Sequence, residues 1–219
     1  MTPALGYGLS ALGAYLAGSI PCSLLLAKYG KGIDLRQHGS GNVGATNVAR
    51  TMGWGWGSVA LLLDATKGLL PTLYIPDLIP MASESQTHQM VLCGLMAIIG
   101  HTFPVWLKFK GGKGVATALG VATVLSWKAI LVSCVVFIVV FAARRIVSLA
   151  SILAVSAFTV AVLFMSWPTP FSAHGWSLSA FAIAAPGLIV LRHASNIVRL
   201  FRGEEKALRV ETPTSDRQG

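Results

Sequence analysis

Three polar segments of this sequence carry the residue types that could do chemistry. The first runs from Gly32 to Arg50 and has Ser40 among three glycines. Glycines let the backbone turn sharply and aim successive N–H groups at one anion. A helix that begins near residues 42–45 would add a favourable dipole for phosphate, with Arg50 two turns further on as a bidentate partner. The predicted phosphate site consists of Gly39, Ser40, Gly41, Asn42, Gly44, Thr46, Asn47 and Arg50. The alternative is a flexible amphipathic loop on a membrane surface.

The second segment, Phe109–Thr117, surrounds Lys113 with Gly111, Gly112 and Gly114. This arrangement predicts a second backbone cradle with a cation, opening onto the start of a helix. It is not a Walker A loop, because a glycine and no hydroxyl for magnesium follows the lysine. A cluster of lysines that reach the membrane interface is the alternative.

The third segment, Arg192–Glu205, places His193 and Asn196 three residues apart, so a helix would present both on one face. A neutral imidazole beside an amide could orient a hydroxyl or accept its proton. A histidine at a membrane interface also serves structural roles. We expect Glu204 to cap a helix or to pair with a loop arginine.

Asp64 and Lys67 lie one helical turn apart within an apolar stretch. Charges inside a membrane suggest function, but this spacing favours a neutralising structural pair.

The composition indicates which elements must position these segments. Hydrophobic residues make up 54 % of the 219 residues and charged residues only 11 %, and the mean hydropathy is +0.67. A soluble domain has about 25 % charged residues. We therefore predict an all-α integral membrane protein with one domain over residues 1–219. Retention of positive charge at the cytoplasmic side explains the 17 Lys and Arg against 8 Asp and Glu. The lipid bilayer is the expected partner, and nucleic acid is not.

Seven apolar stretches are candidate membrane spans, each of which needs about 20 residues. They are Ala4–Ala27, Trp54–Ile75, Gln89–Leu107, Gly114–Ser126, Ala129–Ala143, Ile146–Ser166 and Trp176–Leu191. The fourth rises only about 20 Å against a hydrocarbon core of about 30 Å. A single helix over residues 114–143 is therefore the alternative to the fourth and fifth spans.

The distribution of charge favours seven spans with the N-terminus outside and the C-terminus cytoplasmic. Fifteen of the seventeen Lys and Arg then lie on the cytoplasmic side, whereas six spans divide them almost evenly. The short fourth and fifth spans must be shielded by protein or lie in a thinned bilayer, where a notch could admit a lipid chain. All three polar segments fall at the cytoplasmic face. Residues from about 207 to 219 are expected to form a disordered tail.

Five motifs follow one another along nearly the whole chain. They are G-S-I-P at Gly18–Pro21, D-L-R-x-x-G-S-G-N-x-G-A-T-N-x-x-R at Asp34–Arg50, G-H-x-F-P at Gly100–Pro104, K-G-G-K-G-V-A-T at Lys110–Thr117 and H-x-x-N-I-x-R-L-x-x-G-x-E at His193–Glu205. Together they resemble the PlsY family of acyl-phosphate:glycerol-3-phosphate acyltransferases. The resemblance implies seven spans in the bacterial inner membrane. It also implies transfer of a fatty acyl group from acyl phosphate to the sn-1 hydroxyl of glycerol 3-phosphate, giving lysophosphatidic acid and phosphate. A functional link to the enzyme that forms acyl phosphate follows.

This reaction would need mainly orientation and oxyanion stabilisation, because acyl phosphate already has a weakly basic leaving group. Lys113 and backbone N–H groups are the expected donors. Either His193 or the substrate's own phosphate could accept the hydroxyl proton. Ser40 is expected to donate a hydrogen bond rather than to act as a nucleophile, since no base adjoins it in sequence. We expect no cofactor and no metal.

Other classes fit the sequence less well. No histidine has an aspartate five positions on, as H-x-x-x-x-D acyltransferases require, and no aspartate-rich metal motif of a CDP-alcohol phosphotransferase is present. A transporter of organic phosphate would place its polar residues near the midplane of the bilayer, where only Asp64 and Lys67 are expected.

Overall fold

The computed structural model describes residues 2–173 and 175–208, and every regular element in that part of the chain is helical. The helices are α1 (Pro3–Ser19), α2 (Cys22–Lys31), η1 (Leu35–Gln37), α3 (Ala45–Met52), α4 (Trp54–Leu78), α5 (Ser83–Thr102), η2 (Val105–Leu107), α6 (Val115–Leu125), α7 (Trp127–Arg144), α8 (Val147–Met165), α9 (Trp176–Arg192) and α10 (Ala194–Phe201). The predicted all-α class is confirmed. Most of the predicted tail lies outside the described residues, although Leu208 is described and donates its N–H to the carbonyl of Arg145.

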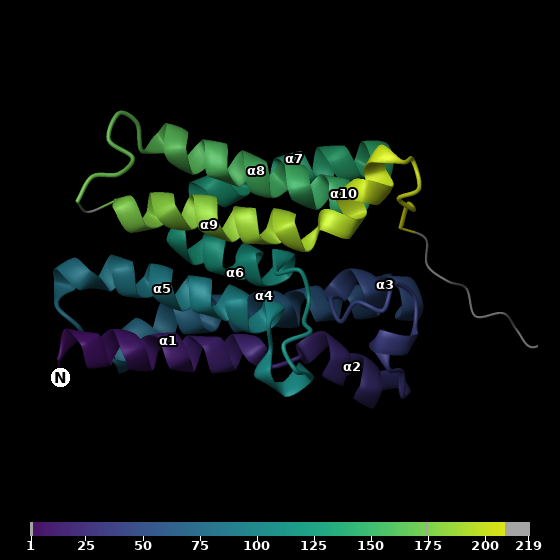
Figure 1. Cartoon of the computed structure of the whole chain (residues 1–219), viewed down its shortest axis with the longest axis horizontal. Coiled ribbons are helices and arrows are strands. Elements are labelled where there is room, and N and C mark those ends of the chain that lie inside the picture. The colour runs from purple at the N-terminus through teal and green to yellow at the C-terminus, as the bar shows by residue number, and fades with distance from the viewer. Residues whose placement is uncertain (1, 174, 209–219) are drawn as a thin grey trace, which may run out of the picture.

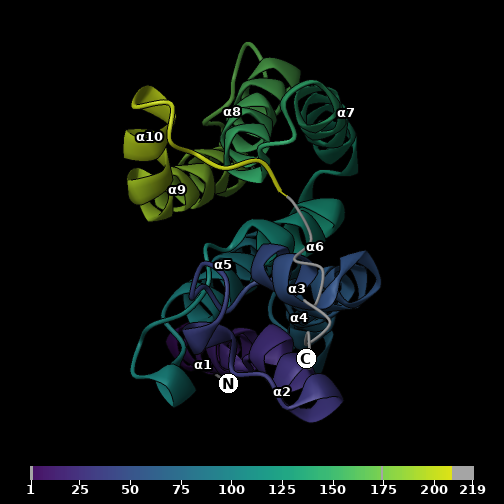
Figure 2. The same cartoon turned by 90° about the vertical axis from the view of Figure 1, so that its right-hand side faces the viewer.

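The helices form two layers with α6 between them (Figures 1 and 2). One layer contains α1, α4 and α5, and the other contains α7, α8 and α9. The short polar helices α2, α3 and α10 lie towards one end of the bundle, and the connection between α8 and α9 lies at the opposite end (Figure 1). The three polar segments therefore lie at one end of the helical bundle, as expected if they share one face of the membrane.

Length and composition identify the elements that can cross a membrane. Five described segments are long and apolar enough, and a sixth is obtained if α9 and α10, which are bent by 62° relative to each other, count as one. The remaining apolar helix, α6, has 11 residues. It rises only about 16 Å and cannot cross a 30 Å core by itself.

The predicted fourth and fifth spans are separate helices, because Ser126 leaves the helical conformation between α6 and α7. The prediction that the fifth span is short is wrong. Helix α7 has 18 residues, since Trp127 and Lys128 already belong to its first turn and Arg144 ends it. Only α6 is short.

Helix α6 is protected by close packing on α4. A Cβ on Gly120 of α6 would lie 1.9 Å from the carbonyl oxygen of Ala65, and one on Gly68 of α4 would lie 2.3 Å from that of Thr117. Only glycine permits such an approach of two backbones, as in many membrane helix pairs. The shielding expected for a short span is present on this side of α6.

The first predicted span is broken at Ile20 and Pro21, which separate α1 from α2. Proline has no N–H to continue a helical ladder. Lys67 donates to the carbonyl of Ile20 at 2.7 Å and pairs with Asp64 at 3.1 Å. Ser23 donates to the other carboxylate oxygen of Asp64 at 2.6 Å. The predicted Asp64–Lys67 pair is confirmed, and it fixes the bend in the N-terminal segment.

Candidate active site

All three polar segments line one cavity of about 750 Å³. Among its walls are all four residues that the sequence suggests for catalysis and seven of the ten suggested for phosphate binding. The four are Ser40, Lys113, His193 and Asn196, and the seven are Gly39, Asn42, Gly44, Thr46, Asn47, Arg50 and Gly114. Asp64 also reaches the cavity. Gly41, Gly111, Gly112 and Lys67 are not part of the cavity wall.

The first segment is folded onto the side chain of Asn47. This residue is 1 % exposed, donates to the carbonyls of Leu35 and His38, and accepts the N–H of Ser40 at 2.8 Å. Gly39 has φ of +59°, and a Cβ there would lie 2.3 Å from Oδ1 of Asn47. Asn47 therefore holds the loop in shape, and its predicted role as a direct phosphate ligand is not what the geometry favours.

The backbone N–H groups of this segment that remain available for an anion are those at the very start of α3, before Asn47, whose N–H is 3.0 Å from the carbonyl oxygen of Gly44. The N–H groups of Gly41 and Gly44 are already bonded within the loop, to the carbonyl of His38 and the side chain of Asn42. Helix α3 begins at Ala45, within the predicted start, and its first N–H groups have no acceptor inside the helix. They open onto the cavity beside Thr46 and the half-buried Arg50. The part of this segment that can bind an anion is thus a helix N-terminus with a guanidinium.

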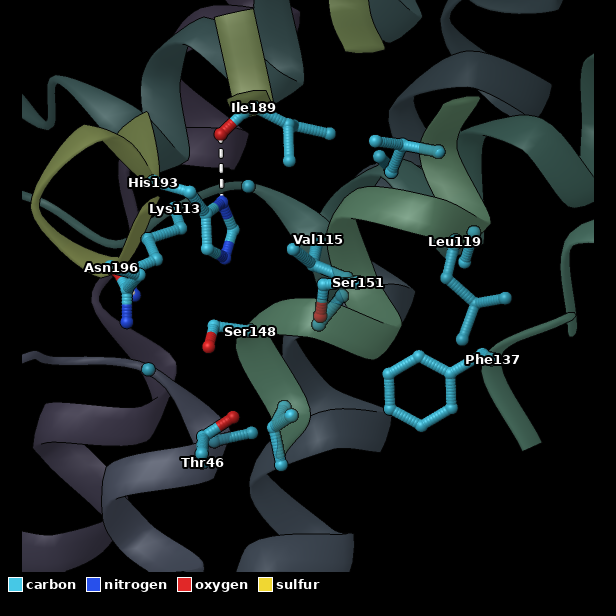
Figure 3. Close-up of a pocket in the computed structure, with 18 of the residues that line it drawn as sticks. Thr46, Lys113, Val115, Leu119, Phe137, Ser148, Ser151, Ile189, His193 and Asn196 are labelled. Carbon is cyan, nitrogen blue, oxygen red and sulfur yellow. Dashed lines mark hydrogen bonds between the residues drawn. The ribbon is translucent and has the colours of Figure 1, made fainter. Parts of the chain in front are cut away.

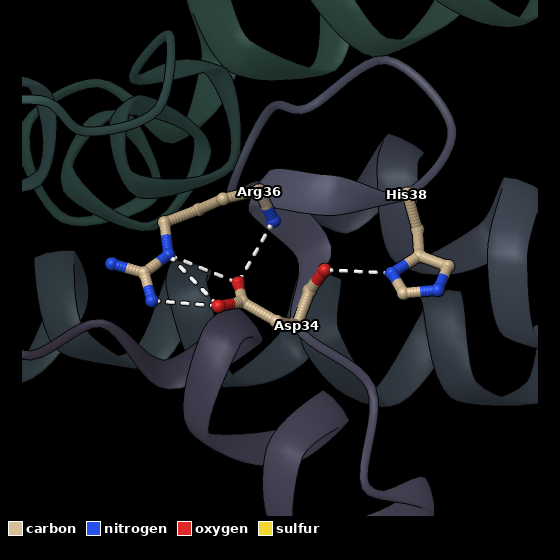
Figure 4. A network of polar contacts seen from close by, with 3 residues as sticks. All are labelled: Asp34, Arg36 and His38. Atoms are coloured by element: carbon tan, nitrogen blue, oxygen red, sulfur yellow. Dashed lines mark hydrogen bonds and ion pairs between the residues drawn. The ribbon is translucent and has the colours of Figure 1, made fainter.

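A neighbouring polar cluster of the same segment, outside the cavity wall, is structural (Figure 4). Asp34 accepts three hydrogen bonds from the guanidinium of Arg36, at 2.9, 3.2 and 2.6 Å, and one from the backbone N–H of Arg36. The hydrogen bonds from Arg36 lower the pKa of Asp34 to about 2. Nδ1 of His38 donates to the carbonyl of Asp34 at 2.8 Å. These contacts shape the turn that leads into the glycine-rich loop.

The second segment differs from the predicted cradle. The N–H groups of Gly111 and Gly112 are both 3.1 Å from carbonyl oxygens at the end of α5, so they are not free to bind an anion. Gly114, with φ of +87°, instead turns the chain into α6. The first-turn amides of α6, beside Val115 and Ala116, face the cavity. Lys113 and the start of α6 form the cradle, and the glycine pair does not.

Lys113 is held by a chain of hydrogen bonds from α10. Its Nζ donates to Oδ1 of Asn196 at 2.5 Å, and Nδ2 of Asn196 donates to Oε1 of Glu205 at 2.6 Å. Glu205 also accepts from Ser148 of α8 at 2.6 Å and from Arg199 at 2.6 Å. Figure 3 shows Lys113, Asn196 and Ser148 around one side of the cavity. Asn196 thus positions the cation.

The carboxylate that supports the site is Glu205, whereas the sequence reasoning chose Glu204. Glu204 is exposed and contributes a backbone hydrogen bond to the carbonyl of Arg199. Burial raises the pKa of Glu205, but the hydrogen bonds from Ser148, Asn196 and Arg199 outweigh this and lower it. Glu205 is the last residue of the motif His193–Glu205, and this place in the motif could have identified it from the sequence. Ser148 was missed, because it lies in an ordinary apolar stretch.

His193 presents an unprotonated nitrogen to the cavity. It follows the end of α9, is 2 % exposed, and its Nδ1 lies 2.8 Å from the carbonyl oxygen of Ile189. A carbonyl only accepts, so Nδ1 carries the proton and Nε2 has a free lone pair. Burial, with the nearby charge of Lys113, lowers the pKa of His193 to about 4. The imidazole is therefore neutral at pH 7 and can accept a proton from a hydroxyl.

Burial also lowers the pKa of Lys113, to about 8, with further lowering by Arg199, Arg50 and Arg192 against an opposing effect of Glu205. The ammonium group remains mostly charged at neutral pH. An anion bound beside it stabilises that charge. The site is thus prepared for an anionic ligand.

The rest of the cavity is apolar and runs between α6, α7, α8 and α9. Leu119 and Phe137 line it on the side away from His193 (Figure 3). Along α8 the lining extends from Val147 to Phe158, a rise of about 16 Å. Phe158 packs edge-on against Phe181 of α9, with ring centroids 6.3 Å apart. One cavity therefore joins a cationic head to an apolar channel.

A helical membrane bundle with such a cavity is suited to binding a molecule that has an anionic group and a fatty chain. Residues 8–203 match the family description glycerol-3-phosphate acyltransferase. The chain belongs to the glycerol-3-phosphate acyltransferase family and is of the PlsY type.

Relatives of similar length support this assignment. A glycerol-3-phosphate acyltransferase of Anaeromyxobacter sp. (strain Fw109-5) is 47 % identical over 94 % of this chain and 98 % of its own. A glycerol-3-phosphate acyltransferase of Myxococcus xanthus (strain DK1622) is 46 % identical over 88 % of this chain and 94 % of its own. The crystal structure of PlsY (YgiH), an integral membrane glycerol 3-phosphate acyltransferase, in its glycerol 3-phosphate form is 39 % identical, with a TM-score of 0.81 over 93 % of this chain and 96 % of that one. The lysophosphatidic acid form of the same protein is 38 % identical in sequence, with a TM-score of 0.79.

Proposed function

We propose that this acyltransferase takes its acyl group from acyl phosphate and delivers it to the sn-1 hydroxyl of glycerol 3-phosphate. The products are lysophosphatidic acid and inorganic phosphate. The observation that carries this proposal is the single cavity with two helix N-termini at its cationic head and one apolar channel. Two anion cradles suit two phosphorylated substrates, and one channel suits one fatty chain.

Each residue of the head has a defined task in this reaction. Lys113 and the amides at the start of α6 bind the phosphate of the donor and stabilise the charge that develops during transfer. Arg50, Thr46 and the start of α3 bind glycerol 3-phosphate.

The sn-1 oxygen attacks the acyl carbon, and the bond from that carbon to the phosphate oxygen breaks. Nε2 of His193 or a substrate phosphate accepts the hydroxyl proton, and the leaving phosphate carries away the electron pair.

We further propose seven crossings of the bacterial inner membrane, with the N-terminus outside and the active site at the cytoplasmic face. Helix α6, shielded by α4, completes the count together with the six longer apolar segments. The gathering of α2, α3 and α10 at one end agrees with the concentration of basic residues predicted there. Acyl phosphate would then arrive from an enzyme that forms it in the cytoplasm.

The donor assignment is tested with purified protein in detergent. Phosphate release and lysophosphatidic acid formation are followed with acyl phosphate, acyl-CoA or an acyl carrier protein thioester, each with glycerol 3-phosphate and a chelator. We expect turnover with acyl phosphate and poor use of the thioesters. Efficient turnover with acyl-CoA, or complete loss of activity in the chelator, contradicts the proposal. Uptake of organic phosphate into proteoliposomes without acyl transfer would favour a transporter instead.

A further inference from the structure

His101 lies behind the loop that carries Lys113, and the reaction described above gives it no task. It is next to the last residue of α5 and is 6 % exposed. Its carbonyl accepts the N–H of Gly112 at 3.1 Å, and the carbonyl of Thr102 accepts that of Gly111 at 3.1 Å. The end of α5 therefore holds the backbone immediately before Lys113.

The imidazole ring of His101 explains why residue 112 is glycine. A Cβ at position 112 would lie 2.1 Å from Nε2 of His101 and 2.8 Å from its Cε1, which no real contact permits. A Cβ at position 111 would instead lie 2.1 Å from the backbone carbonyl oxygen of His101. The two positions thus require glycine for different reasons. A Cβ at position 112 would meet the side chain of His101, and a Cβ at position 111 would meet its backbone.

Asp64 restricts the ring from its other side. Nδ1 of His101 is 3.9 Å from Oδ1 of Asp64, and this carboxylate is fixed by Lys67 and by Ser23. Asp64 is 1 % exposed and Lys67 is 8 % exposed. A buried, paired carboxylate resists displacement, because moving it breaks several contacts together. The ring also borders the cavity, so it is confined on two sides, by Gly112 and by Asp64.

We propose that His101 is a positioning residue for acyl transfer. Backed by Asp64, its ring sets the place of the Gly112 backbone and so directs Lys113 towards the donor phosphate. This inference rests on the proposed function, because it assigns Lys113 to that phosphate. It also gives the glycine at position 112 a steric reason in place of the close approach of an anion.

A double-mutant comparison separates the two explanations. Gly112→Ala should lower kcat/KM by up to about a hundredfold, since a displacement of about 1 Å at a reacting group costs this much. Removing the ring makes room for the methyl group, so His101→Ala/Gly112→Ala should recover about tenfold of that loss. Gly111→Ala meets the backbone and should not recover in the His101→Ala background. If position 112 must approach an anion directly, neither glycine variant recovers.

Two further variants serve as controls for folding and for the added methyl group. His101→Asn provides a second background in case His101→Ala does not fold. Its amide atoms lie near the places of Nδ1 and Cδ2, and it lacks Nε2 and Cε1, the two atoms nearest to a Cβ at position 112. Gly187→Ala in α9 places a Cβ where nothing lies within 4 Å, so it should behave like the wild type. Each variant is first checked for a monodisperse elution profile and for Tm.

The kinetic readout distinguishes positioning from general loss of structure. For His101→Ala we expect a lower kcat and an unchanged KM for glycerol 3-phosphate, because the effect passes through Lys113. The comparison uses whichever acyl donor the wild type accepts, so it remains informative if the acyl-phosphate assignment fails. Equal activity of Gly112→Ala in the wild-type and both His101 backgrounds overturns the inference.

Discussion

Nζ of Lys113 and Oδ1 of Asn196 are 2.5 Å apart, and this contact ties the loop before α6 to α10. The amide of Asn196 is oriented in turn by Glu205. A lysine side chain has considerable rotamer entropy, so fixing it before the substrates arrive lowers the cost of reaching the transition state.

Removal of Lys113 should therefore affect turnover more than binding. We expect Lys113→Ala to lower kcat by about 10²–10³, the usual cost of losing one donor to a developing oxyanion. Asn196→Ala should also lower kcat, because it frees the lysine. His193→Ala should mainly raise KM for glycerol 3-phosphate if a substrate phosphate accepts the proton and the imidazole only orients the hydroxyl, and should lower kcat if Nε2 accepts the proton. Steady-state kinetics with each substrate varied separately measure these effects, and near-normal kinetics for both Lys113→Ala and His193→Ala would contradict the site assignment.

The lowered pKa of Lys113 predicts an alkaline limit to activity. The free enzyme loses this charge as the pH rises through about 8, so kcat/KM should fall above that pH. Lys113→Arg keeps its charge, because a guanidinium does not deprotonate in this range. Its profile should lack the alkaline fall, whatever its absolute rate. The measurement subtracts the spontaneous hydrolysis of acyl phosphate, and identical alkaline limbs in both proteins would exclude Lys113 as the titrating group.

The low pKa of His193 predicts little change of the imidazole charge between pH 5 and pH 7. Since the pKa is lowered to about 4, the ring is neutral throughout this range and Nε2 stays free. Nuclear magnetic resonance of labelled histidine, with His193→Gln used to assign the signal, should show no titration of this ring near pH 6.5. A midpoint near 6.5 would place His193 in a more solvated site than the structure has.

The end of the apolar channel predicts control of acyl-chain length. Phe158 and Phe181 pack against each other where the cavity lining of α8 and α9 stops. Phe158→Ala should shift the preferred donor to longer chains and increase its relative kcat/KM by about tenfold, as expected for a few additional buried methylenes. Leu153→Ala, on the same helix but outside the cavity wall, is the matched control. An unchanged chain-length profile for Phe158→Ala means that chain length is not limited there.

The buried pair of Asp64 and Lys67 predicts a stability effect. Removing one partner leaves an uncompensated charge, at a cost of about 3–5 kcal/mol. Asp64→Asn and Lys67→Met should each lower the Tm measured in detergent, and the double variant should lower it less than the sum. Additive losses would show that the two side chains act separately.

The sequence alone determined the all-helical class of fold and the three polar segments that line the cavity. Apolar stretches interrupted by glycine, proline and charge fix the helices of a membrane protein, because a bilayer requires every backbone group to be bonded within its own element. The three polar segments predicted the cavity head, because glycine-rich loops next to Arg50, Lys113 and His193 suit the binding of an anion. The start of α3 was expressed in a short-range pattern of glycines, whereas the separation of α6 from α7 followed from the distribution of charge along the whole chain.

Only the tertiary structure decided which groups are free to act. Gly111 and Gly112 look like anion ligands in sequence, yet their N–H groups are bonded to α5. Asn47 and Asn196 look like substrate ligands, yet they hold the loop and the lysine. Glu205, rather than its neighbour, reaches Ser148 on another helix. Hydrogen bonds over such separations depend on how the helices pack. That packing depends on close approaches at Gly68, beside the backbone of Thr117, and at Gly120, beside that of Ala65, which no local pattern specifies.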